Sequence, residues 1–198
     1  MLRPFVVRPS VRLLLSAPIN EPTFAMSTPN PTLNVLFLCT HNSARSILAE
    51  AALNHLGKVK GVQRFRGFSA GSSPRENQQP NPLALRALQD AGISTEGLSS
   101  KSWDVFALPD APHMDLVITV CDNAAGEVCP YWPGQPATAH WGYADPSNAP
   151  GSEADKLAAF KQTLLAIHRR LELLINLPLA SVDRLLLQQQ ARDLAQKD

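Results

Sequence analysis

The chain has 198 residues, of which 44% are hydrophobic and 18% charged, a composition typical of a soluble globular protein of one domain. Its net charge of +1 is too small for a broad basic surface, so we expect no nucleic-acid partner, and no apolar run is long enough to span a membrane. The three cysteines are too few, and odd in number, for a disulfide-stapled secreted fold, which favours a reducing, cytoplasmic location.

Residues 1–31 are predicted to be a disordered N-terminal extension. The first 25 residues contain three arginines and no acid before Glu21, and Met26 opens a segment that resembles an ordinary start. We prefer a disordered extension or an upstream start. A cleaved targeting peptide is the alternative, although the apolar stretch at 13–15 is short for the core of a signal peptide.

Strands and helices are predicted to alternate from residue 33 onward. Residues 33–38 form an apolar run typical of a buried parallel strand, and residues 45–56 carry a helical apolar stripe that we expect Gly57 to end. A second, weaker strand is predicted at 62–70, and the sequence SAGSSP (69–74) is predicted to be a loop.

A second helix is expected to begin at Asn81, which resembles an N-cap followed by proline at the first helical position, and to close at Gly92. Residues 116–120 are predicted to form another buried strand that ends at Cys121. The stretch 122–150, rich in glycine, proline and aromatic residues, is predicted to form functional loops.

The chain is predicted to be mainly helical from Leu157 onward. Apolar residues recur at steps of three and four from Leu157 to Leu174, which indicates a long amphipathic helix that Pro178 terminates. A short, weakly amphipathic helix is predicted at 181–197. We therefore divide the chain into a catalytic domain at 32–177 and a C-terminal helical appendage at 178–198.

This alternation predicts an α/β fold in which a parallel sheet is covered by helices on both faces. Ligands of such sheets bind at the carboxyl ends of the strands, where Cys39 and Cys121 are both expected.

The segment VLFLCTHNSARS (35–46) suggests an oxyanion-binding loop. Backbone N–H groups of residues 40–44 and the N-terminus of the following helix can converge on one anion, and Arg45 can hold two of its oxygens. The same positive field favours the thiolate form of Cys39, to which Ser46 can donate a hydrogen bond. Asn42 suits a tight, left-handed turn, and His41 is expected at the solvent-facing rim. A buried structural Cys39 beside a solvated Arg45 is the alternative. The loop comprises Cys39 with Thr40, His41, Asn42, Ser43, Ala44, Arg45 and Ser46.

This loop resembles the phosphate-binding loop of the low-molecular-weight protein tyrosine phosphatase superfamily, and the segments VITVCDNAAGEVCP and HWGYADPS resemble the arsenate reductases of that superfamily. The similarity covers about residues 33–176. It implies a four-stranded parallel sheet flanked by helices, and reduction of arsenate to arsenite by three thiols. Cys39 would attack arsenate, Cys121 would attack Cys39 and release arsenite, and Cys129 would then attack Cys121. Inert packing or a metal-binding pair is the alternative for Cys121 and Cys129.

The resemblance also implies that Asp145, before Pro146, is the proton donor, although an ordinary Asp-Pro turn is the alternative. Ser147 stands where phosphatases commonly carry an aromatic residue. Some relatives have a cysteine at the position of Ala44, so that thiol is not required here. Some bind a monovalent cation such as potassium at positions that match Asn42, Glu50, Ser69 and Asp104.

We thus expect an arsenate reductase that is monomeric and reduced by an external donor, thioredoxin or a glutathione–glutaredoxin couple, without a tightly bound cofactor or transition metal. A low-molecular-weight tyrosine phosphatase is the first alternative, and residual phosphatase activity fits either reading. A non-catalytic thiol sensor of arsenite or metal ions is the second alternative, but such a sensor needs no arginine-bearing oxyanion loop.

Overall fold

The computed structural model describes residues 32–62, 64–122, 135–177 and 184–196. Its centre is a four-stranded sheet in the order β2-β1-β3-β4, in which every pair of neighbours is parallel. The predicted parallel sheet is therefore confirmed. The strands are β1 (Leu33–Cys39), β2 (Phe65–Gly71), β3 (Leu116–Thr119) and β4 (Ala137–His140).

Helices connect and cover the strands. The α-helices are α1 (Arg45–Val59), α2 (Pro82–Asp90), α4 (Glu153–Ile175) and α5 (Arg184–Leu194), and two short 3-10 helices are η1 (Trp103–Phe106) and η2 (Pro146–Asn148). The ends of α2 and α4 follow local sequence rules. Asn81 accepts a hydrogen bond from the Leu83 N–H at the start of α2, and Ser152 and Asp155 form a capping box at the start of α4.

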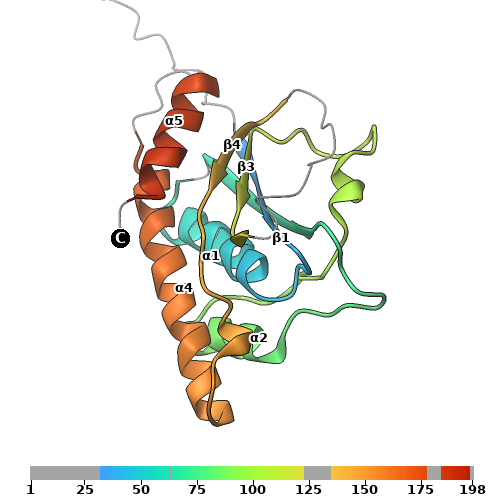
Figure 1. Ribbon diagram of the computed structural model, residues 1–198. Coiled ribbons are helices and arrows are strands. Elements are labelled where there is room, and N and C mark those ends of the chain that lie inside the picture. The colour runs from blue at the N-terminus through green and yellow to red at the C-terminus, as the bar shows by residue number, and fades with distance from the viewer. Residues whose placement is uncertain (1–31, 63, 123–134, 178–183, 197–198) are drawn as a thin grey trace, which may run out of the picture.

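The two faces of the sheet are covered differently. Alternate residues of β1, such as Val35 and Phe37, face the main core, which also takes in the buried sides of α1, α2, α4 and α5. The residues between them, Leu36 and Leu38, face a smaller core closed by Phe106 of η1. Figure 1 shows α4 and α5 running along one side of the sheet.

The strand register places the two described cysteines at the same end of the sheet. Leu38 of β1 pairs with Thr119 of β3, and the Val120 N–H donates to the Leu38 carbonyl. The two strands therefore end at the same level of the sheet. Cys39 closes β1, and Cys121 follows β3 by two residues. This is the end at which the strands have their carboxyl termini, where parallel sheets bind ligands.

Two element boundaries differ from the sequence predictions, and one strand was not predicted. Helix α1 runs through Gly57 to Val59, and the chain instead turns at Gly61, which has a φ of 64°. Strand β2 pairs with β1 along the whole length of β1 and extends to Gly71. Residues 69–71 are therefore strand rather than loop. Strand β4 lies inside the stretch predicted to be loops.

The predicted C-terminal helix is present as α5, which contacts α4 and β4. Its Ala191 carbonyl accepts a hydrogen bond from the buried Trp141 indole at 2.8 Å. Within the described ranges, no helix combines the length and apolar character needed to cross a membrane.

Candidate active site

The loop after β1 curls around the Cys39 sulfur. The Asn42 N–H donates to Cys39 Sγ at 3.2 Å, and Ser46 Oγ lies 3.0 Å from the same sulfur. Ser46 Oγ already accepts a hydrogen bond from Asn42 Nδ2 at 2.9 Å, so its own hydrogen is available to Cys39. Both contacts hold one buried sulfur in a fixed place at the start of the loop.

Asn42 is the residue that fixes the curl. It is fully buried, and its φ of 50° is the left-handed conformation that asparagine tolerates better than most residues. Its backbone carbonyl accepts from Ser100 Oγ at 2.6 Å, and its side-chain oxygen accepts from the Lys101 N–H at 2.9 Å. The loop is thus clamped by the segment that precedes η1.

Gly71, at the end of β2, allows the loop to pack this closely. A Cβ at this position would lie 2.7 Å from the Thr40 carbonyl oxygen and 2.9 Å from the Asn42 nitrogen, both backbone atoms that cannot move aside independently. The next two residues hydrogen-bond the loop, because the Ser72 and Ser73 N–H groups donate to the Cys39 and Thr40 carbonyls. Any larger residue at 71 would push the loop away.

Arg45 opens helix α1 and is held from the opposite side of the site. Its Nη2 donates to Asp145 Oδ2 at 2.7 Å and its Nη1 donates to the Tyr143 carbonyl at 2.9 Å, whereas its buried Nε has no hydrogen-bond partner among the residues that the structure describes. The second Asp145 oxygen accepts from the Ser147 N–H at 3.0 Å. The guanidinium and the carboxylate are therefore held together by direct contacts.

The N-terminus of α1 has no side-chain cap, because Ala44 stands at the N-cap position. Uncapped N–H groups at a helix start, together with the helix dipole, suit a bound anion. A cavity of about 800 Å³ opens at this point. Its walls are Cys39, Arg45 and neighbouring loop residues on one side, and residues 75–82 with Asp145, Ser147 and Asn148 on the other.

The remaining loop residues lie at the rim. The exposed His41 ring contacts the Ser73 carbonyl through Nδ1 at 2.9 Å, and Ser43 Oγ lies 3.5 Å from the Gln79 carbonyl. Within the described part of the chain, neither of these two side chains forms a hydrogen bond with the Cys39 sulfur.

A second thiol lies next to the loop. Cys121 is buried and free, like Cys39, and its sulfur is 3.7 Å from Thr40 Oγ1. Because Thr40 directly follows Cys39, the structure brings both sulfurs to one end of β1 and β3. Cys129, the third predicted thiol, lies outside the described residues.

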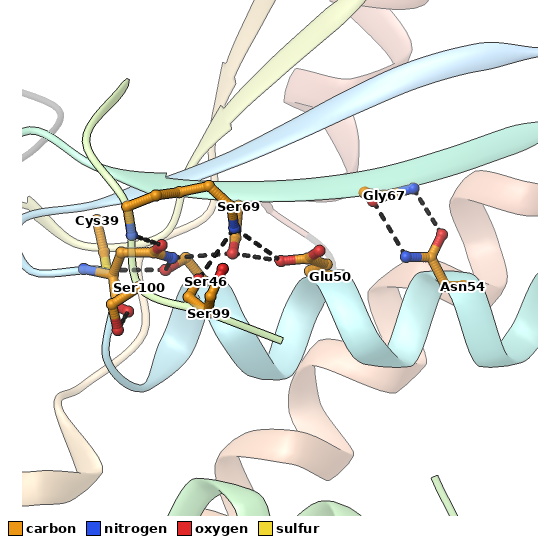
Figure 2. A network of polar contacts seen from close by, with 10 residues as sticks. Cys39, Ser46, Glu50, Asn54, Gly67, Ser69, Ser99 and Ser100 are labelled. Atoms are coloured by element: carbon orange, nitrogen blue, oxygen red, sulfur yellow. Dashed lines mark hydrogen bonds and ion pairs between the residues drawn. The ribbon is translucent and has the colours of Figure 1, made fainter. Parts of the chain in front are cut away.

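A buried polar cluster supports the loop from behind, as Figure 2 shows from Cys39 and Ser46 through Ser69 to Glu50. Asn42 Nδ2 donates to Ser69 Oγ at 2.9 Å, and Ser69 Oγ donates to Glu50 Oε2. Burial raises the pKa of the Glu50 carboxyl, and the charge of Lys101 and the Ser69 hydrogen bond lower it by less. Burial likewise lowers the pKa of Lys101, whose Nζ is 3.9 Å from Glu50 Oε2.

The residues predicted to hold a potassium ion make other contacts in this structure. The Asn42 side-chain oxygen accepts from the Lys101 N–H, and the Lys101 ammonium lies 3.9 Å from Glu50 Oε2. The fourth predicted ligand, Asp104, is exposed and bonds locally to Ser102 Oγ at 2.8 Å. Among the described residues, no three His, Cys, Asp or Glu side chains gather as a metal site.

Sequence reasoning missed two residues of this site, Gly71 and Lys101. Gly71 follows a predicted strand, and a glycine there is a recognised sign of close backbone approach, so its role was open to prediction. Lys101 lies in a polar loop segment and gives no such sign, because its contact with Glu50 arises only in the tertiary structure.

Comparison with known proteins connects this geometry to two activities. The family model for low molecular weight phosphotyrosine protein phosphatases matches residues 34–187. An arsenate reductase of Bacillus licheniformis is 39% identical over 140 residues, which cover 70% of this chain and 91% of the relative. An arsenate reductase of Bacillus subtilis (strain 168) is 35% identical over 139 residues, with the same two coverages. A solved structure of an arsenate reductase in the phosphate-binding state is 26% identical with a TM-score of 0.53, and the match covers 73% of this chain and 97% of that one.

Proposed function

This chain belongs to the low molecular weight phosphotyrosine protein phosphatase family, and from that premise we propose that it is an arsenate reductase that converts arsenate to arsenite. One observation carries the choice within the family. Cys121 is a free, buried thiol beside Thr40, at the same edge as Cys39. Hydrolysis of a phosphoester needs no second thiol, whereas reduction of arsenic needs two electrons, which two thiols supply when they form a disulfide.

In the proposed first step, the Cys39 thiolate attacks arsenate held by the loop N–H groups and by Arg45. A bond forms between sulfur and arsenic, and one arsenate oxygen leaves as water after it receives a proton. Asp145 is our candidate donor, supported by its position in the cavity wall beside Arg45.

In the second step, the Cys121 thiolate attacks the Cys39 sulfur. The sulfur–sulfur bond forms, the sulfur–arsenic bond breaks, and its electron pair goes to arsenic, which leaves as arsenite. Cys129 then attacks Cys121, frees Cys39 and leaves a Cys121–Cys129 disulfide. This last step rests on the family resemblance and on the sequence, since Cys129 lies outside the described residues.

An external thiol donor must then reduce the enzyme. We propose thioredoxin, or a glutathione–glutaredoxin couple, acting on a monomer in the cytoplasm, where free thiols persist. We also infer that the ammonium of Lys101, rather than a bound potassium ion, supplies the positive charge beside Glu50.

The second candidate is a phosphatase, because Cys39, Arg45 and Asp145 would suffice for phosphoester hydrolysis. The cavity walls argue against an aryl phosphate as the preferred substrate. The residues that line the cavity in the described part of the chain include no Phe, Tyr or Trp, and polar residues such as Gln78, Asn81 and Ser147 contribute to the wall instead.

One experiment separates these functions. The protein is mixed with arsenate, thioredoxin, thioredoxin reductase and NADPH, and its cleavage of p-nitrophenyl phosphate is measured in parallel. We expect arsenate-dependent NADPH oxidation that is lost in Cys39→Ser and in Cys121→Ser, while Cys121→Ser keeps whatever phosphoester cleavage the wild type has. Brisk phosphoester cleavage without arsenate-dependent oxidation would establish the phosphatase, and no turnover of either substrate would favour a thiol sensor.

A further inference from the structure

A histidine outside the oxyanion loop contacts the chain on both sides of Cys121. His140 ends strand β4, and its Nδ1 lies 2.8 Å from Thr119 Oγ1. Its Nε2 lies 3.1 Å from Asp122 Oδ1. Thr119 is two residues before Cys121 and Asp122 is one residue after it, so a single imidazole spans the cysteine.

The imidazole is held at both of its ring nitrogens, by a hydroxyl on one side and by a carboxylate on the other. Thr119 is itself fixed, because it pairs with His140 in the sheet and its carbonyl accepts from the Trp141 N–H at 2.8 Å. The ring therefore connects a rigid strand to the residue that follows Cys121.

Gly142 leaves the space in which this contact forms. A Cβ at position 142 would lie 2.9 Å from Asp122 Oδ1 and 3.1 Å from His140 Nε2, the same two atoms that contact each other. The sequence HWG thus supplies the imidazole and, two residues later, the room for its partner.

The contact is too exposed to contribute much stability. The Asp122 side chain is 90% exposed and that of His140 is 41% exposed, and ion pairs of this kind are worth little in water. The contact instead affects the orientation of the chain around Cys121. The chain is held before and after a cysteine that is only 3% exposed and whose sulfur is directed toward Thr40.

We propose that His140 is a positioning residue that, through Thr119 and Asp122, aligns Cys121 for its attack on Cys39. The inference rests on the proposed function, since it concerns the step in which the sulfur–sulfur bond forms and the electron pair of the sulfur–arsenic bond leaves with arsenite. Thiol–disulfide exchange needs an accessible, correctly directed attacking sulfur, so loss of alignment slows this step and leaves anion binding intact.

The test is a single turnover in a Cys129→Ser background, where the Cys39–Cys121 disulfide should accumulate. Its formation is followed by acid quench, thiol alkylation and peptide mapping, and phosphate affinity is measured on the same proteins. We expect His140→Ala to slow disulfide formation several-fold, with phosphate affinity unchanged. His140→Gln, whose amide can still reach Asp122, should recover much of the rate, and His168→Ala on α4 should match the parent.

Gly142→Ala keeps His140 and Asp122, but its added methyl group separates the two side chains. It should therefore slow disulfide formation without changing phosphate affinity, and it replaces His140→Ala in the test if that variant does not fold. Disulfide formation in His140→Ala and Gly142→Ala at the rate of the parent would overturn the proposal. An equal loss of phosphate affinity would also overturn it, because that result indicates general disruption. A parent that never links Cys39 to Cys121 would instead refute the thiol relay itself, which keeps the two failures distinct.

Discussion

At the scale of single residues, the site depends on how one sulfur is surrounded. Cys39 receives the Asn42 N–H and faces the Ser46 hydroxyl, and Asn42 orients that hydroxyl through its side-chain amide. Cys39, Arg45 and Asp145 could be selected from the sequence, because a thiol after an apolar run, an arginine at a helix start and an Asp-Pro pair each leave a local pattern. Gly71 also leaves a local sign, because it is a glycine at the end of a predicted strand. Lys101 leaves none, because its contact with Glu50 joins residues that are distant in sequence.

We predict that Ser46→Ala slows the reaction of Cys39 far more than it weakens oxyanion binding. The variant loses a hydrogen bond to an ionised sulfur, an interaction worth about 1.5–3 kcal/mol. The first-turnover rate should therefore fall by about tenfold to a hundredfold. The rate of Cys39 alkylation by iodoacetamide should fall with it, and Ser73→Ala, at an exposed position on the neighbouring loop, should behave like the wild type. A Ser46→Ala variant with unchanged alkylation and turnover would show that the hydroxyl does not support the thiolate.

At the scale of elements, strand β4 was the hardest to predict. It has four residues, ATAH, of which two are alanines with low strand propensity, and it lies in a stretch rich in glycine and proline. Its alternating burial is evident only once β3 is beside it. By contrast, β1 and β3 were predictable because they lie in nearly continuous apolar runs, and α4 because its apolar periodicity is long. The end of α1 was misplaced because Gly57 packs inside the helix, and Gly61 makes the turn.

The contact between the segment before η1 and α1 predicts how the enzyme responds to monovalent cations. Because Lys101 places its ammonium beside Glu50, exchange of potassium for sodium at constant ionic strength should leave the arsenate reduction rate unchanged. Lys101→Met removes that charge, so the variant should be slower and should become sensitive to the choice of cation. Wild-type activity that rises several-fold with potassium would show that a bound ion, and not Lys101, balances Glu50.

The same contact predicts a pH dependence of stability. Burial raises the pKa of Glu50 above its ordinary value of 4.5, so the folded protein retains a proton that the unfolded chain releases. The contribution of Glu50 to the free energy of unfolding is full below that ordinary pKa and is lost as pH rises through the raised pKa. In urea titrations over roughly pH 4 to 7, the stability of the wild type relative to Glu50→Gln should therefore decline as pH rises.

Glu172→Gln is the matched control, because a hydrogen bond from Lys60 lowers the pKa of Glu172. Its contribution is present above the ordinary pKa and lost as pH falls, so the difference between wild type and Glu172→Gln should have the opposite slope. A difference between wild type and Glu50→Gln that stays flat or rises with pH would contradict the account of Glu50.

At the scale of the whole molecule, the C-terminal helix is part of the main core. Leu187, Ala191 and Leu194 of α5 are buried in it, and the Trp141 indole donates to the Ala191 carbonyl. We predict that Trp141→Phe lowers the free energy of unfolding by about 1–3 kcal/mol, because a buried carbonyl loses its donor. Leu165→Ala, at an exposed position of α4, should change it by no more than about 0.5 kcal/mol, and urea denaturation measures both. Equal stability of Trp141→Phe and the wild type would show that α5 does not depend on this contact.

The central claim is that Cys39 and Cys121 together supply the electrons that reduce arsenic. The most direct test treats the Cys129→Ser variant with one equivalent of arsenate, quantifies arsenite and maps disulfide-linked peptides. The account predicts one arsenite released for each Cys39–Cys121 disulfide formed. Arsenite released while those two sulfurs remain unlinked would contradict it.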